Sequence, residues 1–280
     1  MFVITQKEQL NRSVVRLVIS APQVAAKAQP GQFVILRVDE NGERIPLTIA
    51  DYDRSAGTVT VIVQSVGATT LALSRKDVGD TIPDFVGPLG RATETDGLKR
   101  VAVIAGGVGA AIALPVAKKL YEQGAQVHVV CGFRSREMVI LQDEFSAVSH
   151  RLITVTDDGS FGERGLVTDA LRQLIDGGET YDEVIAIGPI PMMKYVSLLT
   201  AEYGIKTVVS MNPVMIDGTG MCGGCRLTVG GQVKFACVDG PEFDGHQVDF
   251  DEVLQRSRLY ERQERHAYEA TCNLLNKEVR

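Results

Sequence analysis

The sequence predicts a two-domain α+β protein, in which an antiparallel β-barrel precedes a doubly wound α/β domain and a small cysteine-bearing segment follows. Three observations support this fold class. Residues 1–97 hold short runs rich in Val and Ile between turn residues, which is typical of a small antiparallel barrel. Residues 98–211 alternate apolar strand-like runs with helical stretches, as in a parallel sheet. Residues 212–250 carry three of the five cysteines, and residues 251–280 form a charged, helical tail.

Length and composition narrow the class further. A chain of 280 residues is long enough for two domains with separate cores. The net charge of −6 argues against a nucleic-acid partner. The first residues do not resemble a signal peptide, and no apolar run approaches the length of a membrane span, so we expect no membrane partner. We therefore expect a cytoplasmic protein, whose reduced cysteines favour metal ligation over disulfides.

The first part contains a candidate anion site. Arg44 and Thr48 lie four residues apart around the start of an expected strand, and Gly67 precedes an expected helix over residues 69–75. A helix N-terminus after a glycine binds anions readily, so the two features together suit a diphosphate. The alternatives are a surface arginine and a simple threonine cap. The expected strands of this part are residues 13–20, 32–38, 47–51 and 58–66.

Two short motifs in this part resemble those of the ferredoxin-reductase-like flavoproteins. Arg44, Pro46 and Thr48 match their Arg-x-(Tyr/Pro)-x-(Ser/Thr) motif, and Gly67 and Thr70 match their Gly-x-x-(Ser/Thr) motif. The resemblance implies a barrel that binds FAD, with Arg44 and Thr70 at the diphosphate and Thr48 beside the flavin ring. The FAD-binding residues that it implies are Arg44, Pro46, Leu47, Thr48, Val66, Gly67, Thr69 and Thr70.

The middle part has a glycine turn where a parallel sheet binds ligands. We expect strands at residues 100–105, 126–131, 152–156, 183–187 and 207–210, with helices at 110–123, 138–146, 166–175 and 191–202. Ligands of such sheets bind at the carboxyl ends of the strands. Gly106, Gly107, Val108 and Gly109 follow the first strand, but Ile112 stands where a full G-x-G-x-x-G motif has its last glycine.

The same flavoproteins use a Gly-Gly-x-Gly turn at this place, which implies a nicotinamide nucleotide. The resemblance extends to the segments after the next strands. The implied binding residues are Gly106, Gly107, Val108, Gly109, Arg134, Asp157, Asp158, Gly188 and Pro189. Hydride transfer between nicotinamide and flavin is carried by the cofactors, so we expect no catalytic side chain. Arg134 and Arg136 leave NADH and NADPH both open, and the resemblance favours NAD(H).

The cysteine segment has the spacing of an iron–sulfur site. Asp217, Cys222, Cys225 and Cys237 form a D-x4-C-x2-C-x11-C pattern, and plant-type [2Fe–2S] proteins use C-x4-C-x2-C with a distant fourth cysteine. Residues 226–236 read as a hairpin that returns Cys237 to the loop. The pattern predicts a [2Fe–2S] cluster. Zinc is the alternative metal, and Asp239 is the alternative fourth ligand.

The order of flavin barrel, nicotinamide domain and cluster segment resembles the electron-transfer subunits of dihydroorotate dehydrogenase and their relatives. An aspartate as first ligand resembles the small (alpha) subunits of the NADH-dependent reduced ferredoxin:NADP oxidoreductases. The resemblance implies an electron-bifurcating heterodimer or higher hetero-oligomer with a larger flavin and iron–sulfur subunit, which reaches ferredoxin indirectly. The alternatives are a subunit of a dihydroorotate dehydrogenase, a sulfide dehydrogenase or a hydrogenase, and, more distantly, a zinc-stapled nucleotide-binding sensor. The tail is either a solvated helix or a docking arm.

Overall fold

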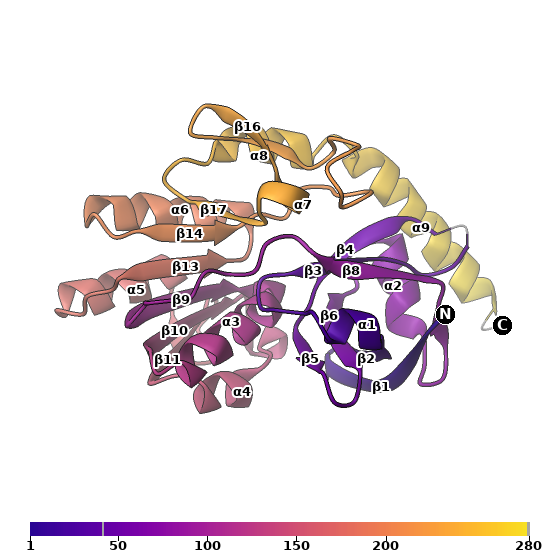
Figure 1. Ribbon diagram of the computed structural model, residues 1–280, viewed down its shortest axis with the longest axis horizontal. Helices are drawn as coiled ribbons and strands as arrows, with labels where there is room; N and C mark the ends of the chain where they lie inside the picture. The colour runs from indigo at the N-terminus through magenta and orange to yellow at the C-terminus, as the bar shows by residue number, and fades with distance from the viewer. Residues whose placement is uncertain (41, 279–280) are drawn as a thin grey trace.

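The computed structural model describes residues 1–40 and 42–278, with side chains described up to residue 271. The first part folds into two antiparallel sheets around one apolar core (Figure 1). The short helices α1 (Pro22–Ala25) and α2 (Ala68–Arg75) accompany the sheets. One sheet has the order β5-β6-β2-β1-β7 and the other the order β4-β3-β8. The strands are β1 (Phe2–Asn11), β2 (Val14–Ser20), β3 (Phe33–Arg37), β4 (Arg44–Thr48), β5 (Asp51–Asp53), β6 (Thr58–Gln64), β7 (Thr81–Ile82) and β8 (Asp84–Leu89).

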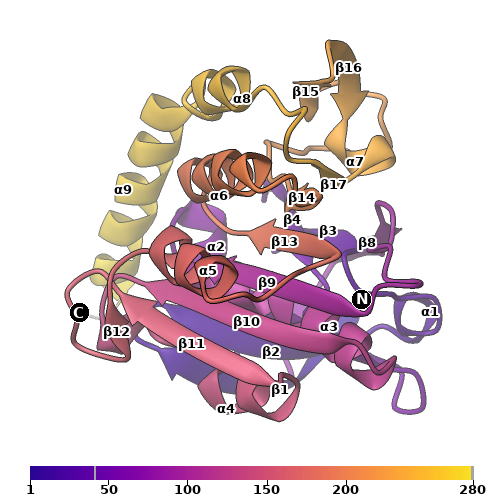
Figure 2. The ribbon, with the colours of Figure 1, turned by 90° about the vertical axis from the view of Figure 1, so that its left-hand side faces the viewer.

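The second part is a seven-stranded sheet of order β12-β11-β10-β9-β13-β14-β17. Its first six strands are parallel, and β17 pairs antiparallel with β14. Helices α3 and α4 cover one face, while α5 and α6 cover the other (Figure 2). The strands are β9 (Arg100–Gly106), β10 (Gln126–Phe133), β11 (Arg151–Thr156), β12 (Glu163–Arg164), β13 (Glu183–Ile187), β14 (Thr207–Ser210) and β17 (Glu242–Asp244). The helices are α3 (Ala110–Glu122), α4 (Gln142–Ala147), α5 (Val167–Asp176) and α6 (Ile190–Glu202).

The helix expected over residues 138–146 begins later than predicted. A short 3-10 turn covers Arg136–Met138, and Leu141 has a left-handed backbone with φ of 61°. A leucine in that conformation interrupts a helix, so α4 starts only at Gln142. The predicted parallel, doubly wound sheet is confirmed, with β12 and the antiparallel β17 as edge strands that the periodicity did not predict.

The C-terminal part begins with the predicted hairpin, β15 (Arg226–Val229) and β16 (Gln232–Phe235). Gly230 and Gly231 connect the strands with φ of 58° and 73°, as a tight hairpin turn requires. The helices α7 (Ala236–Asp239), α8 (Phe250–Ser257) and α9 (Glu261–Glu278) follow, and α9 lies beside α2 of the first part (Figure 1). The last two residues of the predicted tail, 279–280, lie outside the described residues.

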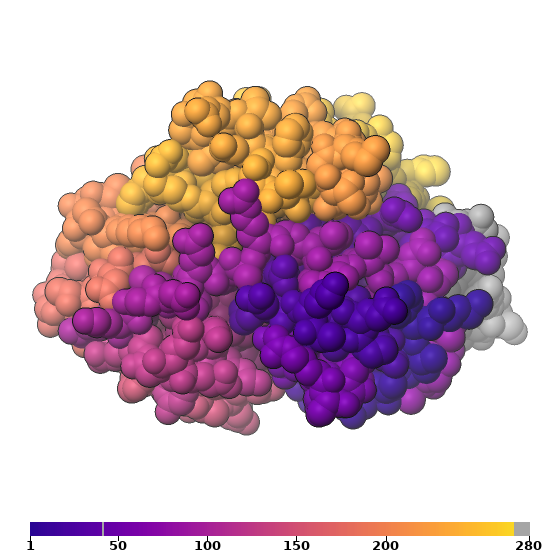
Figure 3. Space-filling view, viewed as in Figure 1, coloured from indigo at the N-terminus to yellow at the C-terminus, as the bar shows by residue number. Residues whose placement is uncertain are grey.

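The C-terminal part rests on both earlier parts (Figure 3). The backbone N–H of Arg91, in the link between them, donates to Gly240 O at 2.7 Å, and Met211 N–H donates to Pro241 O at 2.8 Å. Gly218, with φ of 75°, packs so closely that an added Cβ would lie 2.8 Å from Leu89 Cδ1. The segment is therefore anchored where the two domains meet. Among the described helices, none combines the length and apolar character needed to span a membrane.

Candidate cofactor sites

A cleft of about 660 Å³ lies where the two antiparallel sheets meet the parallel sheet. It gathers many of the residues predicted from the two motifs and the glycine turn. These residues come from β4, from the start of α2 and from the loops after β9, β10 and β13. The predicted residues in its lining are Pro46, Leu47, Thr48, Val66, Thr70, Gly106, Gly107, Val108, Gly109, Arg134, Gly188 and Pro189.

The cleft also contains residues that the sequence reasoning missed. Met211, Asn212 and Met215 line it, although no motif marked them. A signal was present, because these residues directly follow β14 and ligands of parallel sheets bind at the carboxyl ends of strands. Phe33 of β3 and Pro241 complete this side of the lining.

The N-terminus of α2 faces the cleft through Val66 and Thr70. The Thr70 hydroxyl accepts hydrogen bonds from the backbone N–H groups of Val66 at 3.0 Å and Gly67 at 2.9 Å. It also donates to Gly67 O at 3.0 Å. Thr70 therefore shapes the loop before the helix. The positive end of the helix dipole suits an anion at this position.

Arg44 does not belong to the lining of the cleft. It lies on β4 with a half-exposed side chain, and its Nη2 is 3.6 Å from Asp84 Oδ2. Arg37 Nε approaches the same carboxylate oxygen at 2.8 Å. Two guanidinium groups thus approach one carboxylate at this edge of the sheet. Gly67 and Thr69 are also outside the lining, and Thr69 Oγ1 donates to Glu43 Oε2 at 3.2 Å.

The glycines of the turn after β9 allow a close approach to the loop after β13. A Cβ on Gly109 would lie 2.5 Å from Ile187 O and 2.8 Å from Gly188 Cα. A Cβ on Gly106 would lie 2.4 Å from Met192 Sδ. Both distances are shorter than real Cβ contacts, so a side chain at either position displaces its neighbour. Packing therefore accounts for Gly106 and Gly109, whereas Gly107 has open space around it and a left-handed φ of 55°.

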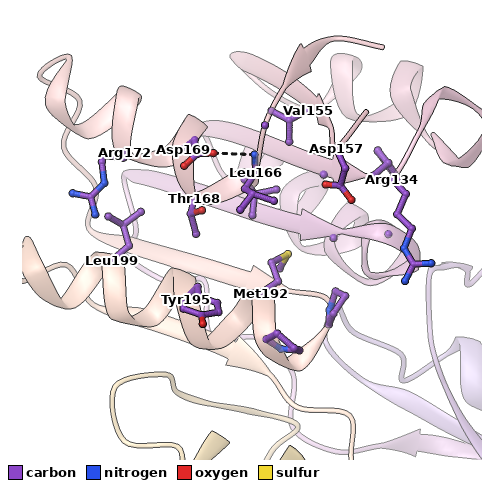
Figure 4. Close-up of a pocket in the computed structure, with 18 of the residues that line it drawn as sticks. Arg134, Val155, Asp157, Leu166, Thr168, Asp169, Arg172, Met192, Tyr195 and Leu199 are labelled. Carbon is purple, nitrogen blue, oxygen red and sulfur yellow. Dashed lines mark hydrogen bonds between the residues drawn. The ribbon is translucent and has the colours of Figure 1, made fainter. Parts of the chain in front are cut away.

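A second pocket, of about 780 Å³, lies between the ends of the parallel strands and the helices α5 and α6. It shares Gly106, Gly107, Arg134 and Pro189 with the cleft, so the two spaces adjoin. Figure 4 shows Arg134 and Asp157 at one end, and Tyr195, Leu199 and Arg172 towards the other. The pocket thus offers charged groups at both ends, with Arg172 at the end far from the glycine turn, together with apolar side chains such as Leu199.

The two predicted aspartates after β11 differ in their surroundings. Asp157 lines the second pocket. Asp158 is not in the lining, and its Oδ1 accepts from the Ser160 hydroxyl at 2.6 Å and from Ser160 N–H at 2.9 Å. These hydrogen bonds hold the pKa of Asp158 below its usual value. Asp158 therefore shapes the loop that carries Asp157.

The predicted cluster ligands lie on one loop and the hairpin beside it. Cys225 Sγ and Cys237 Sγ are 3.2 Å apart and both residues are buried, whereas Cys222 is exposed. The Asp217 carboxylate accepts from Cys222 N–H at 2.6 Å and from Thr219 N–H at 2.7 Å. The Asp239 carboxylate instead accepts from Phe235 N–H at 2.8 Å, outside the ligand loop.

The donor set fits an iron–sulfur cluster chemically, because three thiols and a carboxylate are anionic ligands when deprotonated. Within the part of the chain that the structure describes, no three His, Cys, Asp or Glu side chains already converge on one metal position. Burial, with a smaller contribution from Cys225, raises the pKa of the Cys237 thiol to about 12 in the metal-free chain. Metal binding there must release protons.

The comparisons with known proteins find two family models that match parts of the chain. Residues 103–198 match the family model of the oxidoreductase NAD-binding domain. Residues 212–249 match the iron–sulfur cluster binding domain of dihydroorotate dehydrogenase B. The cytochrome b5 reductase domain of Ulva prolifera nitrate reductase is 16% identical, with a TM-score of 0.61 over 74% of this chain and 95% of that one, which shows the fold alone. Fold and sites thus define a ferredoxin-reductase-like oxidoreductase.

Full-length relatives narrow this class. The chain is 48% identical to a dihydroorotate dehydrogenase B (NAD(+)) electron transfer subunit homolog of Thermotoga maritima, over 95% of this chain and 94% of the relative. It is 34% identical to the electron transfer subunit of Desulforamulus reducens, over 81% and 89%. The chain belongs to the family of dihydroorotate dehydrogenase B electron transfer subunits and their homologues.

A solved structure with high sequence identity also supports this family membership. One chain of the NADH-dependent reduced ferredoxin-NADP oxidoreductase, whose structure was used to study flavin-based electron bifurcation, is 46% identical. Its TM-score is 0.91 over 96% of this chain and 97% of that chain. The predicted fold and the oxidoreductase class are confirmed, as are the three kinds of cofactor, namely FAD, a nicotinamide nucleotide and an iron–sulfur cluster.

Proposed function

We propose that the chain is an electron-transfer flavoprotein subunit that connects NAD(H), FAD and a [2Fe–2S] cluster and exchanges electrons with a larger partner subunit. The observation that supports this most directly is the composition of the cleft. It combines the barrel motif, the glycine turn and the segment that leads to the cysteines in one lining. When bound, FAD exchanges a hydride with nicotinamide and single electrons with an iron–sulfur centre.

In this proposal the FAD-binding groups are the two barrel motifs. The N-terminus of α2, held in shape by Thr70, and the charge of Arg44 bind the diphosphate. Thr48, which lines the cleft, lies beside the flavin ring. The motif residues assigned to FAD are Arg44, Pro46, Leu47, Thr48, Val66, Gly67, Thr69 and Thr70.

The second pocket takes the nicotinamide nucleotide. Its shared lining with the cleft supports this assignment, because the nicotinamide must reach the flavin while the adenosine stays on the parallel sheet. We assign Gly106, Gly107, Val108, Gly109, Gly188 and Pro189 to the turn and loop that the nucleotide crosses, with Arg134, Asp157 and Asp158 after the neighbouring strands. NAD(H) is the proposed coenzyme.

Asp217, Cys222, Cys225 and Cys237 are the proposed ligands of the [2Fe–2S] cluster. The match of residues 212–249 to an iron–sulfur family model supports iron over zinc. The hydrogen bond between Asp217 and Cys222 N–H supports Asp217 over Asp239 as the fourth ligand. The proposed functional parts are residues 1–97, 98–211, 212–250 and 251–280.

The 46% identical chain belongs to a structure described for flavin-based electron bifurcation, which supports an electron-bifurcating assembly. In this proposal the larger partner carries its own flavin and iron–sulfur centres, and ferredoxin is reached through it. The second candidate is a subunit that serves a dihydroorotate dehydrogenase, because the Thermotoga maritima relative carries that name. We also propose a cytoplasmic location, since none of the described cysteines, Cys131, Cys222, Cys225 and Cys237, forms a disulfide.

The test is a visible spectrum of the purified chain together with FAD, iron, sulfide and zinc assays. About one FAD, two irons and two sulfides per chain are expected. Zinc without flavin would refute the electron-transfer function. Co-purification from the native host then distinguishes the partners, because a dihydroorotate-oxidising subunit would favour the second candidate.

A further inference from the structure

A short segment, residues 211–217, joins β14 to the cysteine loop, and Met215 lies at its centre. Met215 is only 5% exposed, although the exposed Val214 and Ile216 flank it. Its side chain lines the cleft that we assign to the flavin. Met215 also belongs to the same buried apolar cluster as Cys225 and Cys237. It therefore belongs both to the lining of the cleft and to the large apolar cluster that contains the two cysteines.

The neighbours of Met215 contact the cysteine loop directly. A Cβ built on Gly224 would lie 3.5 Å from Val214 O and 3.9 Å from Ile216 Cδ1, both ordinary contact distances. The residues on each side of Met215 thus lie near Gly224 of the Cys222–Cys225 loop, Val214 through its backbone and Ile216 through its side chain. Because protein interiors are close-packed, a change in the volume of Met215 is transmitted to this loop.

We propose that Met215 is a positioning residue for electron exchange between flavin and cluster, an inference that rests on the function proposed above. Met215 lines the cleft, so its polarizable thioether would be available to contact the ring of a flavin bound there. Its volume also keeps the cysteine loop at a fixed separation from the cleft. Each electron that leaves the reduced flavin converts one ferric iron of the cluster to ferrous, and Met215 itself is neither oxidised nor reduced.

The chain offers a matched control for this role. Met193 on α6 is fully buried in the same apolar cluster but lines neither the cleft nor the second pocket. Met193→Ala therefore creates a similar loss of packing without altering the flavin cleft. Met215→Leu approximately conserves the volume of the side chain and replaces the thioether with a branched hydrocarbon.

The first measurement is an FAD titration of the full-length, cluster-containing chain from which FAD has been removed. Met215→Ala is expected to raise the Kd for FAD about 2- to 10-fold, the range set by a sulfur–aromatic contact. Met193→Ala is expected to leave it unchanged. Equal values of Kd for the two alanine variants would overturn the proposal.

The second measurement is stopped-flow mixing of the loaded chain with NADH, recorded at flavin and cluster wavelengths. Met215→Ala is expected to slow cluster reduction while flavin reduction keeps its rate, and Met193→Ala and Met215→Leu are expected to slow neither. Cluster reduction that is as fast in Met215→Ala as in Met193→Ala contradicts the positioning role.

If the Met215→Ala variant does not bind its cofactors, Met215→Leu still tests the proposed contact between Met215 and the flavin. The leucine variant is expected to shift the visible absorption band of the bound flavin, because it removes the sulfur beside the ring. An unshifted band would overturn the contact. A wild-type chain that binds neither FAD nor iron would instead refute the proposed function, and that result is distinguishable from all of these.

Discussion

Glu242 on β17 gives the sharpest prediction about stability. Its Oε1 accepts a hydrogen bond from Thr93 Oγ1 at 2.7 Å, at the joint between the C-terminal part and the link after the barrel. Burial raises the pKa of Glu242 from 4.5 to about 7. The hydrogen bond from Thr93 lowers the pKa, while the carboxylates of Glu183 and Glu94 raise it further. The protein therefore favours the protonated form of this group.

The direction in which the free energy of unfolding changes with pH follows from proton linkage. Between pH 4.5 and 7 the unfolded chain has released this proton while the folded chain still holds it, so the free energy of unfolding falls as pH rises. Below pH 4.5 the Glu242 carboxyl group is protonated in both the folded and the unfolded chain, so it causes no loss of unfolding free energy. The shift of the pKa from 4.5 to about 7 corresponds to a loss of about 3 kcal/mol, which is complete above pH 7.

Glu242→Gln removes the titration and keeps an oxygen that can accept from Thr93. At pH 8 the variant is expected to be more stable than the wild type by about 2–3 kcal/mol, and at pH 5 by no more than about 1 kcal/mol. Because the chain contains no tryptophan, urea unfolding is followed by far-UV circular dichroism. Glu122→Gln, at an exposed position on α3, is the control and should show no such pH dependence. A difference between Glu242→Gln and wild type that stays constant from pH 5 to 8 would refute the reasoning.

Three further substitutions test the sites. Gly109→Ala would place a Cβ 2.5 Å from Ile187 O, so it should lower the unfolding free energy by about 1–3 kcal/mol. It should also weaken NADH binding measured by calorimetry. Unchanged values of both quantities would argue against tight packing of the turn. Thr70→Ala removes the hydroxyl that orders the loop before α2, so it should cost about 1 kcal/mol and weaken FAD binding, whereas Thr70→Ser should retain both. Cys225→Ser should lose iron but retain FAD, and Cys131→Ala should keep both; loss of FAD from Cys225→Ser would show that the two sites are not separate.

Local patterns were sufficient to predict most of the parallel sheet and the hairpin. The strands β9, β10, β11, β13 and β14 are apolar runs that end in recognisable turns, so short-range sequence carries the information. The strand β1 was not predicted, because half of its ten residues are exposed and only Ile4 is fully buried, so it shows no clear apolar run. The edge strand β17 is three residues long and exists through its pairing with β14, which no local pattern encodes.

The candidate site likewise combines residues that local motifs predicted with residues whose position depends on distant contacts. Motif spacing placed Thr48, Thr70 and the glycine turn in advance, and the cleft brings them together. Met215 carried no motif, because its position depends on how the segment after β14 folds back between sheet and barrel. Arg44 matched a motif, yet it lies outside the lining of the cleft. Its guanidinium group is 3.6 Å from the carboxylate of Asp84, and motif spacing does not predict an ion pair between residues so distant in sequence.

The cysteine segment is integrated into the fold through contacts with both domains. Its strand β17 forms the last strand of the parallel domain's sheet, and Glu242 on that strand accepts from Thr93 at the exit of the barrel. The residues that line the flavin cleft next to this segment, Met211 and Pro241, are joined to each other by a backbone hydrogen bond of 2.8 Å. In the proposed arrangement, close packing of these residues beside the cleft would fix the separation between flavin and cluster. A relay that must pass single electrons repeatedly benefits from such a fixed separation, since no domain movement has to precede each transfer.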